Sequence, residues 1–430
     1  MNEKSILRKI EGHAEEVIDL TQQLVRYPSE NWEITGKEGD CQRFVASWMR
    51  EVFDQVDVFT PNEVSGCQEH PAFWPGRDYT DRPNVVGTLK GAGQGRSLIF
   101  HGHIDVVPIE ELPWDHAPYG GEIEGGKIFG RGSLDQKGGI AASLIAAKML
   151  REAGVRLAGD VIVESVVDEE YAGANGTVAC IARGYRADAG ISTEPSGMVV
   201  HRTNRSGRVY RILSKGGKPD QWISRRNDAV FNPAFVLARM VLALQEFELV
   251  RNRAERSHPI CVEIPWTTPV MIAKIKAGDV RPGGLLAIPA EAWLEAWIYG
   301  LPGITAEQLD REVIGFLEEW IEKDPFLVEH RPEILTPTRF LEPSSVAENH
   351  PIVGTLAGNI EIATGRPAVV KEGGSTSDVG ILNNWGKTPT VTFGPGGGNA
   401  HSPDEYVNVS DLLSLTKIYA LEMASWCGVA

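Results

Sequence analysis

A histidine and an aspartate stand two positions apart at the point where an apolar segment of the chain ends. Residues 97–100 are predicted to form a buried strand, and His103 and Asp105 follow it in the run His-Gly-His-Ile-Asp. If the strand continues, both side chains point to one face. A metal-bound imidazole usually donates its second N–H to an oxygen, often a carboxylate. The pair therefore suits a metal site, and a polar strand end without metal is the alternative. His101 shares this face, and we assign it a structural role.

Three adjacent carboxylates end a second predicted strand, which spans residues 161–167. Asp168, Glu169 and Glu170 repel one another, and beside an apolar strand their ionisation is costly unless a cation compensates it. On a solvated loop the same residues would need no partner. In a reactive site, one glutamate could bind a metal while another takes a proton from water.

Three further candidates lie next to predicted elements or on a loop. Asp135 precedes an alanine-rich helix predicted at residues 138–150, where it could cap the helix or bridge two metals. Glu194 follows another apolar segment, and His401 lies on a glycine-rich loop, where a lone histidine is usually only solvated. Nitrogen and oxygen ligands without thiolate suit zinc, cobalt or manganese. Two such ions about 3.5–4 Å apart could polarise an acyl oxygen and hold a hydroxide.

The elements that must position these residues alternate between strand and helix in the first 200 residues. This order predicts βαβ units in a mostly parallel sheet, which binds ligands at its strand ends. From residue 201 the order becomes β-α-β-β-α-β, that of a ferredoxin-like domain. Its elements are predicted at 209–213, 233–247, 271–275, 292–298, 306–322 and 326–329. We therefore predict an α/β fold with a catalytic domain at 1–200 and 338–430, interrupted by an inserted α+β lid domain at 201–337.

The composition argues against several classes of protein. The 430 residues include 42 lysines and arginines against 58 aspartates and glutamates, a net charge of −16, which disfavours nucleic acid and anionic membranes as partners. No apolar run is long enough to span a bilayer, and Lys4, Arg8 and Lys9 interrupt any signal-peptide core. Five cysteines without a C-x-x-C pair suit a reducing compartment. We expect a cytoplasmic protein.

Five segments, taken together and in this order, resemble the metallo-amidohydrolase and metallopeptidase family of acetylornithine deacetylase, succinyl-diaminopimelate desuccinylase, aminoacylase and carboxypeptidase G2. They are the segments around His103, Asp135, Glu169, Glu194 and His401. The resemblance covers nearly the whole chain, including the insert, which in this family is a lid that usually pairs two subunits. It therefore implies a homodimer formed through the lid. It also implies a cis peptide bond between Asp135 and Gln136.

The resemblance implies a metal-binding role for five of the candidates. His103 and Glu194 would bind one metal ion. Glu170 and His401 would bind a second ion, and Asp135 would bridge the two. The expected ions are zinc, with cobalt or manganese as alternatives.

The reaction that the resemblance implies is hydrolysis of an amide bond in a small N-acylated compound. A water that bridges the metals would attack the carbonyl carbon. Glu169 would act as the general base and then protonate the leaving amine. Asp105 would complete the catalytic residues by orienting His103.

One stretch departs from the family pattern and leaves the substrate contacts open. Relatives commonly carry a histidine near the start of the lid that reaches the partner's active site, but residues 214–222 contain none. Arg225 or Arg226 could replace it as substrate contacts, or His201 or His258 could. Solvated surface arginines are the alternative. Thr376, in a glycine-rich turn, is another candidate contact, with ordinary turn hydrogen bonding as its alternative.

Three functions fit these observations. The first is an acetylornithine deacetylase-like enzyme that acts on a small N-acylated amino acid. The second is an amidase of the same family with another substrate, namely a formylaminopyrimidine deformylase, a succinyl-diaminopimelate desuccinylase or a dipeptidase. The third is a non-catalytic binding homologue, against which the complete set of candidate ligands argues.

Overall fold

The chain folds into two compact units in the computed structural model. One comprises Met1–Asn204 and Ser344–Ala430, and the other comprises Arg205–Pro343. The structure describes residue 6 and residues 15–109, 111–172, 174–216, 231–254, 268–278, 288–301 and 303–430. Among these residues, no helix has the length and apolar character that a membrane crossing requires.

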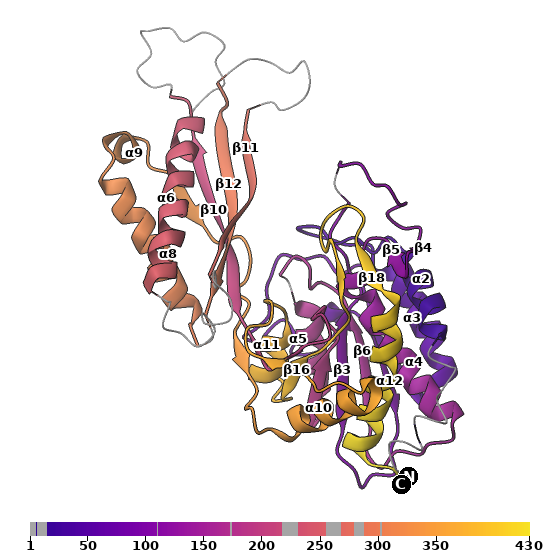
Figure 1. The fold of residues 1–430 in the computed structure, drawn as a ribbon. Coiled ribbons are helices and arrows are strands. Elements are labelled where there is room, and N and C mark those ends of the chain that lie inside the picture. The colour runs from indigo at the N-terminus through magenta and orange to yellow at the C-terminus, as the bar shows by residue number, and fades with distance from the viewer. Residues whose placement is uncertain are drawn as a thin grey trace. The chain divides into compact units, whose positions relative to one another are not determined.

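A mostly parallel sheet forms the centre of the first unit (Figure 1). In order across the sheet, its strands among the described residues are β1 (Gln55–Phe59), β2 (Asn84–Leu89), β6 (Val161–Val166), β3 (Leu98–His103), β7 (Ala189–Ser192), β16 (Thr390–Thr392), β8 (Val200–His201) and β15 (Val370–Lys371). The central strands β6, β3, β7 and β16 run parallel, whereas β1 and β2 join one edge antiparallel. The predicted α/β fold with a mostly parallel sheet is confirmed.

Helices cover this sheet because alternate side chains of its buried strands point to opposite faces. Leu98 and Phe100 join a large apolar core. The helices that share this core are α2 (Glu16–Val25), α3 (Gly39–Val52), α4 (Gly138–Glu152), α10 (Pro351–Thr364) and α12 (Val409–Cys427). On the other face His101 contacts Thr177 of α5 (Asn175–Arg183). Helix α11 (Val379–Asn384) lies later in the chain. Figure 1 shows α4 beside α12, with which it packs.

A small antiparallel sheet, which the sequence did not predict, joins distant parts of the first unit. Its strands are β17 (Gly397–Gly398), β18 (Tyr406–Asn408), β5 (Lys127–Phe129) and β4 (Glu122–Glu124). Tyr406 pairs with Phe129. This register brings the loop between β17 and β18, which contains His401, next to the segment that follows β5 and contains Asp135.

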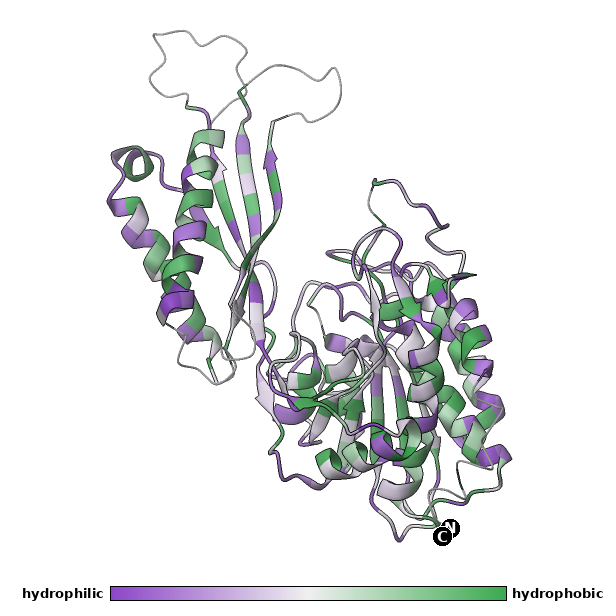
Figure 2. Ribbon diagram, viewed as in Figure 1, coloured by the Kyte–Doolittle hydropathy of each residue, from purple (hydrophilic) through white to green (hydrophobic). Residues whose placement is uncertain are grey.

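The second unit has the β-α-β-β-α-β order predicted from the sequence. Its elements are β10 (Ser206–Lys215), α6 (Ala234–Ala254), β11 (Val270–Ala277), β12 (Glu291–Gly300), α8 (Ala306–Glu322), α9 (Pro325–Glu329) and β13 (Glu333–Leu335). The antiparallel sheet has the order β11-β12-β10-β13, which is ferredoxin-like. Its strands are banded by hydropathy in Figure 2, because alternate side chains such as Tyr210 and Ile212 enter the core under α6 and α8.

The last strand of this unit lies later in the chain than the sequence predicted. Residues 326–329 form part of helix α9, and the strand is β13 at Glu333–Leu335. The Asp324 carboxylate accepts a hydrogen bond from the Phe326 backbone N–H at 2.9 Å, and Pro325 occupies the first turn of the helix. This cap and the fixed φ of proline start a helix where the apolar residues alone suggested a strand.

Candidate metal centre

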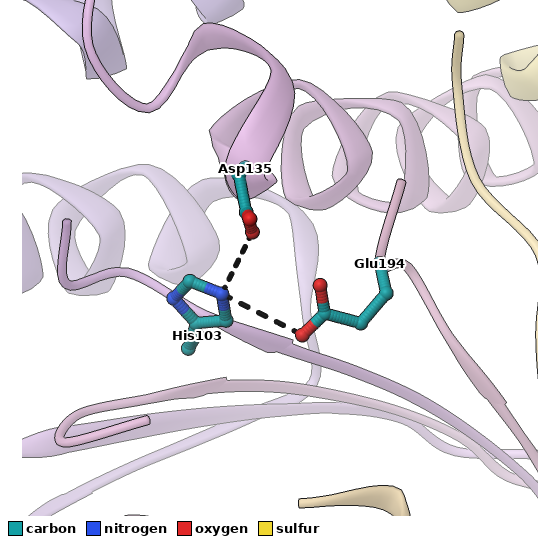
Figure 3. A group of neighbouring side chains, drawn as sticks. All are labelled: His103, Asp135 and Glu194. Carbon is teal, nitrogen blue, oxygen red and sulfur yellow. Dashed lines mark hydrogen bonds and ion pairs between the residues drawn. The ribbon is translucent and has the colours of Figure 1, made fainter. Parts of the chain in front are cut away.

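His103 lies at the carboxyl end of β3 and is the centre of the first group of candidate ligands. Its Nε2 is 3.1 Å from Asp135 Oδ1 and 3.6 Å from Glu194 Oε1. Figure 3 shows both carboxylates directed at the imidazole ring, one from the turn before α4 and the other from the loop after β7. The carboxyl ends of the neighbouring parallel strands β3 and β7 meet at one edge of the sheet, which explains why His103 and Glu194 lie together.

His401 is the centre of a second group, which shares Asp135 with the first. His401 Nε2 is 2.9 Å from Glu170 Oε2 and 3.4 Å from Asp135 Oδ2. Asp135 thus presents a different oxygen to each histidine, and the peptide bond that follows it is cis. Half of the His401 side-chain surface is exposed, whereas only 4% of the Glu170 side chain is, so the second group forms the open side of the centre.

Glu169 is buried beside both groups but is not the nearest carboxylate to either histidine. Its Oε2 is 4.0 Å from His103 Nε2, farther than the nearest oxygens of Asp135 and Glu194. Burial raises the pKa of the Glu169 carboxyl well above its usual value, and the neighbouring charges of Asp378 and Glu170 add to this effect. Glu169 is therefore a carboxylate with a raised proton affinity, which suits a group that accepts and returns a proton.

Opposite charges at the centre shift the pKa values of its other groups. Burial disfavours the charged form of His103, yet its hydrogen bond with Asp135 and the charges of Glu194 and Glu169 raise its pKa well above the usual value. The charge of Glu170 raises the pKa of His401 in the same way. Although the partial burial of Asp135 opposes ionisation, its hydrogen bonds with the two histidines lower its pKa. The centre is a strongly negative environment that stabilises cations.

The two groups have the donors that two divalent cations require. Each combines imidazole nitrogen with carboxylate oxygen and lacks thiolate, a donor set typical of zinc, cobalt or manganese. Glu194 Oε1 and Glu170 Oε1 are buried, and neither accepts a hydrogen bond from any residue that the structure describes. Buried polar atoms normally have partners. These oxygens therefore fit the role of metal ligands, and the shared Asp135 fits the role of a bridge.

The Asp105 carboxylate lies closer to the backbone N–H groups of Glu169 and Glu170 than to the His103 ring. His103 Nδ1 is 2.9 Å from the Asp105 backbone oxygen, whereas the Asp105 carboxylate is 3.7 Å away. That carboxylate accepts hydrogen bonds from the backbone N–H groups of Glu169, at 3.2 Å, and Glu170, at 3.0 Å. One residue thus orients the imidazole through its main chain and holds the glutamate turn through its side chain.

Asp168 turns the chain so that the two glutamates face the centre. Its φ is 72°, a left-handed conformation that a non-glycine residue adopts rarely. Its carboxylate accepts hydrogen bonds from Arg77 and from the Tyr79 hydroxyl, the latter at 2.5 Å, and it is 3.5 Å from Arg82. Asn31 links this network to Asp105 through a hydrogen bond of 2.8 Å. The cations that compensate Asp168 are therefore arginines, which the sequence analysis did not identify.

A further carboxylate of the centre, Asp378, was also missed. Ligand oxygens of Asp378, Glu169 and Glu194 lie within 4.8 Å of one another. Asp378 accepts hydrogen bonds from Thr177 and from His101 Nε2, the latter at 2.8 Å. The signal was an acidic residue directly before a short apolar helix, a position at which a helix cap is the ordinary explanation.

The candidate substrate contacts are less well defined than the metal ligands. Thr376 is half-buried in the turn that leads to Asp378. His201, at the end of β8, lies beside this turn, since a Cβ at Gly374 would be 3.2 Å from His201 Cβ. Arg225, Arg226 and His258 lie outside the described residues.

Comparison with known proteins shows the family of the chain. The model of peptidase family M20/M25/M40 matches residues 99–424. The chain belongs to this family. Among solved structures, the M20/M25/M40 chain is similar to the dipeptidase Dug1p from Saccharomyces cerevisiae, with a TM-score of 0.80, 14% identity, and coverage of 99% of this chain and 98% of that one. This similarity concerns the fold.

Two curated relatives of this family member carry the same name, N-formyl-4-amino-5-aminomethyl-2-methylpyrimidine deformylase. The protein from Bacillus subtilis is 30% identical over 453 aligned positions, which cover 98% of this chain and 97% of that protein. The protein from Halalkalibacterium halodurans is 27% identical, with coverage of 99% and 97%. The chain is thus a metal-dependent amidohydrolase. Its relatives match the formylaminopyrimidine alternative rather than the acetylornithine deacetylase that the sequence analysis placed first.

Proposed function

We propose that the protein is a deformylase that hydrolyses the N-formyl group of an aminomethylpyrimidine, the kind of compound in its relatives' names. The observation that carries this proposal is the 30% identity to the Bacillus subtilis deformylase over 98% of the chain. The complete set of candidate ligands, with Glu169 beside them, supports hydrolysis rather than binding alone.

In this proposal the side chains of the centre divide the work. His103 and Glu194 hold one divalent cation, Glu170 and His401 hold the other, and Asp135 contacts both. When bound, the cations supply Lewis-acid polarisation of the amide carbonyl and acidify water. Glu169 takes a proton from the attacking water and transfers it to the nitrogen of the leaving amine, because its carboxylate lies beside the ligand groups but is farther from His103 than Asp135 and Glu194 are.

The test is a comparison of substrates with zinc-loaded protein. N-formyl-4-amino-5-aminomethyl-2-methylpyrimidine, N-acetylornithine and a dipeptide are supplied separately, and formate, acetate or free amine is quantified. We expect the formylated pyrimidine to have a kcat/KM at least tenfold above the others. A higher value for N-acetylornithine would contradict the proposed substrate, and no turnover of any amide by metal-loaded protein would contradict the hydrolase.

We propose zinc as the metal and a homodimer formed through the second unit. Metal analysis of the purified protein tests the first point, with about two zinc ions per chain expected. Exposed apolar side chains support the second: Met271 and Ile275 on the edge strand β11, with exposures of 51% and 57%, and Phe235 and Leu242 on α6.

Light scattering of a chromatographed sample tests the dimer. Substitution of Met271 and Ile275 by aspartate is expected to yield monomers, because each charge would be buried in the interface. The control is Ile362→Asp, which alters a residue of the first unit that is 40% exposed. A monomeric wild type would contradict the proposed dimer.

Thr376, Arg225 and Arg226 remain proposed substrate contacts. A rise in KM with little change in kcat upon substitution by alanine would support such a role.

A further inference from the structure

A buried glutamate outside the two ligand groups connects the segments that carry Asp135 and His401. The Glu405 side chain is fully buried. Its Oε1 accepts hydrogen bonds from the backbone N–H groups of Leu134 and Asp135, each at 3.0 Å. Its Oε2 accepts a hydrogen bond of 2.9 Å from Arg131, whose side chain is 1% exposed. One carboxylate thus holds the backbone of the shared ligand Asp135.

The same residues also hold the loop of His401. Glu405 stands four positions after His401, and its backbone oxygen accepts a hydrogen bond of 2.8 Å from Gly130. Arg131 donates a second hydrogen bond, of 3.2 Å, to the backbone oxygen of Ser402. The pairing of β18 with β5 continues this connection. Arg131 and Glu405 therefore form a clasp between the two segments. Each side chain bonds to the backbone of the opposite segment, and the two side chains bond to each other.

The clasp bears on metal binding because Asp135 must present one oxygen to each group. His103 Nε2 and His401 Nε2 lie 3.1 and 3.4 Å from different Asp135 oxygens. A displacement of the backbone at residue 135 would change both distances, and a displacement of the loop at residue 401 would change the distance between His401 and Asp135. Residues that hold metal ligands in place commonly alter metal affinity 10–100-fold when replaced.

We propose that Glu405 is a positioning residue that sets the metal affinity of the centre, by holding Asp135 and the His401 loop in register through its pairing with Arg131. This inference rests on the proposed metal ligands. It concerns binding of the metals rather than the identity of the substrate.

The experiment measures zinc affinity of the full-length protein without substrate, by competition with a chromophoric chelator. Glu405→Gln keeps the size of the side chain but removes the charge and one of its two acceptor oxygens. We expect its zinc dissociation constant to rise roughly 10–100-fold. At saturating zinc the KM should equal that of the wild type, and most of kcat should return.

The matched control is Glu422→Gln. Glu422 is also fully buried, and it accepts a hydrogen bond of 2.6 Å from Asn359, so it joins α12 to α10 rather than the two ligand segments. We expect this variant to keep wild-type zinc affinity. Arg131→Lys, which keeps the charge but loses the planar guanidinium, serves as a second variant and is expected to weaken affinity less than Glu405→Gln.

Three outcomes would overturn the proposal. Zinc affinity of folded Glu405→Gln within twofold of wild type would show that the clasp does not position the ligands. If Glu405→Gln does not fold, unchanged affinity of Arg131→Lys would lead to the same conclusion. Equal losses of affinity in Glu405→Gln and Glu422→Gln would show a general effect of buried substitutions. If the wild type itself binds no zinc, the proposed metal centre fails, which is a separate result.

Discussion

Replacement of Glu169 by glutamine tests whether this residue transfers protons or holds metal. Glu169 Oε2 is 4.0 Å from His103 Nε2, whereas Asp135 and Glu194 present oxygens at 3.1 and 3.6 Å. Both histidines therefore keep their carboxylate partners in Glu169→Gln. The amide retains the shape of the side chain and cannot accept a proton from water. We expect unchanged metal content together with a large loss of kcat.

The size of the loss follows from the single function that the variant removes. General acid–base catalysis by one side chain contributes about 10²–10⁴-fold to a rate. At about 1.36 kcal/mol for each factor of ten, the barrier should rise by about 2.7–5.4 kcal/mol. KM should change little, because a glutamine of the same shape leaves the pocket intact.

The assay combines steady-state hydrolysis of the best substrate with metal analysis of the same sample. Glu194→Gln is the comparison variant, since Glu194 belongs to the His103 group and its substitution should lower metal content as well as rate. More than a tenth of the wild-type rate in Glu169→Gln would refute the role as general base. Loss of metal from Glu169→Gln would instead show that Glu169 is a ligand.

Three further predictions concern metal removal, a buried ion pair and pH. A chelator should abolish hydrolysis and lower the melting temperature, and added zinc should restore both, because a cation offsets the repulsion between the carboxylates of the centre. A melting temperature that the chelator leaves unchanged would contradict the metal centre. Arg82→Met should lower the free energy of unfolding by about 3–5 kcal/mol in a denaturant titration, because Glu38 stays buried without the guanidinium that bonds it at 2.6 and 2.8 Å. Arg43→Met, which breaks an exposed ion pair, is the control and should have a small effect. Burial raises the pKa of Glu422 to about 8 in the folded protein, so its protonated form stabilises the fold at low pH. This contribution is lost as the pH rises from the usual pKa near 4.5 through about 8. Melting temperatures between pH 5 and pH 9 should therefore fall more steeply for wild type than for Glu422→Gln, and parallel profiles would contradict the raised pKa.

Features that depend on local pattern could be predicted from the sequence. The β-branched residues 161–163 and the apolar residues 98–100 lie in central strands, because strands buried on both faces are rich in apolar residues. The candidate ligands follow such strands or lie in nearby loops. The convergence of His103, Glu169, Glu170 and Glu194 therefore follows from parallel strands that end at one edge of the sheet.

Features that depend on pairing between distant segments could not be predicted in this way. The two-residue strand β17 has no hydropathy pattern, yet its sheet brings the His401 loop to Asp135. Arg77 and Arg82 precede Asp168 by more than eighty residues, so nothing local reveals that they compensate its charge. Asp378 was missed for the same reason, because its partner His101 lies 277 positions away.

The point at which the chain leaves and re-enters the first unit has a consequence for modular engineering. Asn204 and Ser344 are partners in the antiparallel pair of β9 (Thr203–Asn204) and β14 (Ser344–Ser345), and the Ser344 hydroxyl donates a hydrogen bond to Asn204 at 2.5 Å. The two ends of the inserted segment are thus neighbours, and a tight Asn-Gly hairpin has the geometry to join them directly. Excising the ferredoxin-like module, or grafting a foreign one at this junction, would leave every described metal ligand on its own strand or loop.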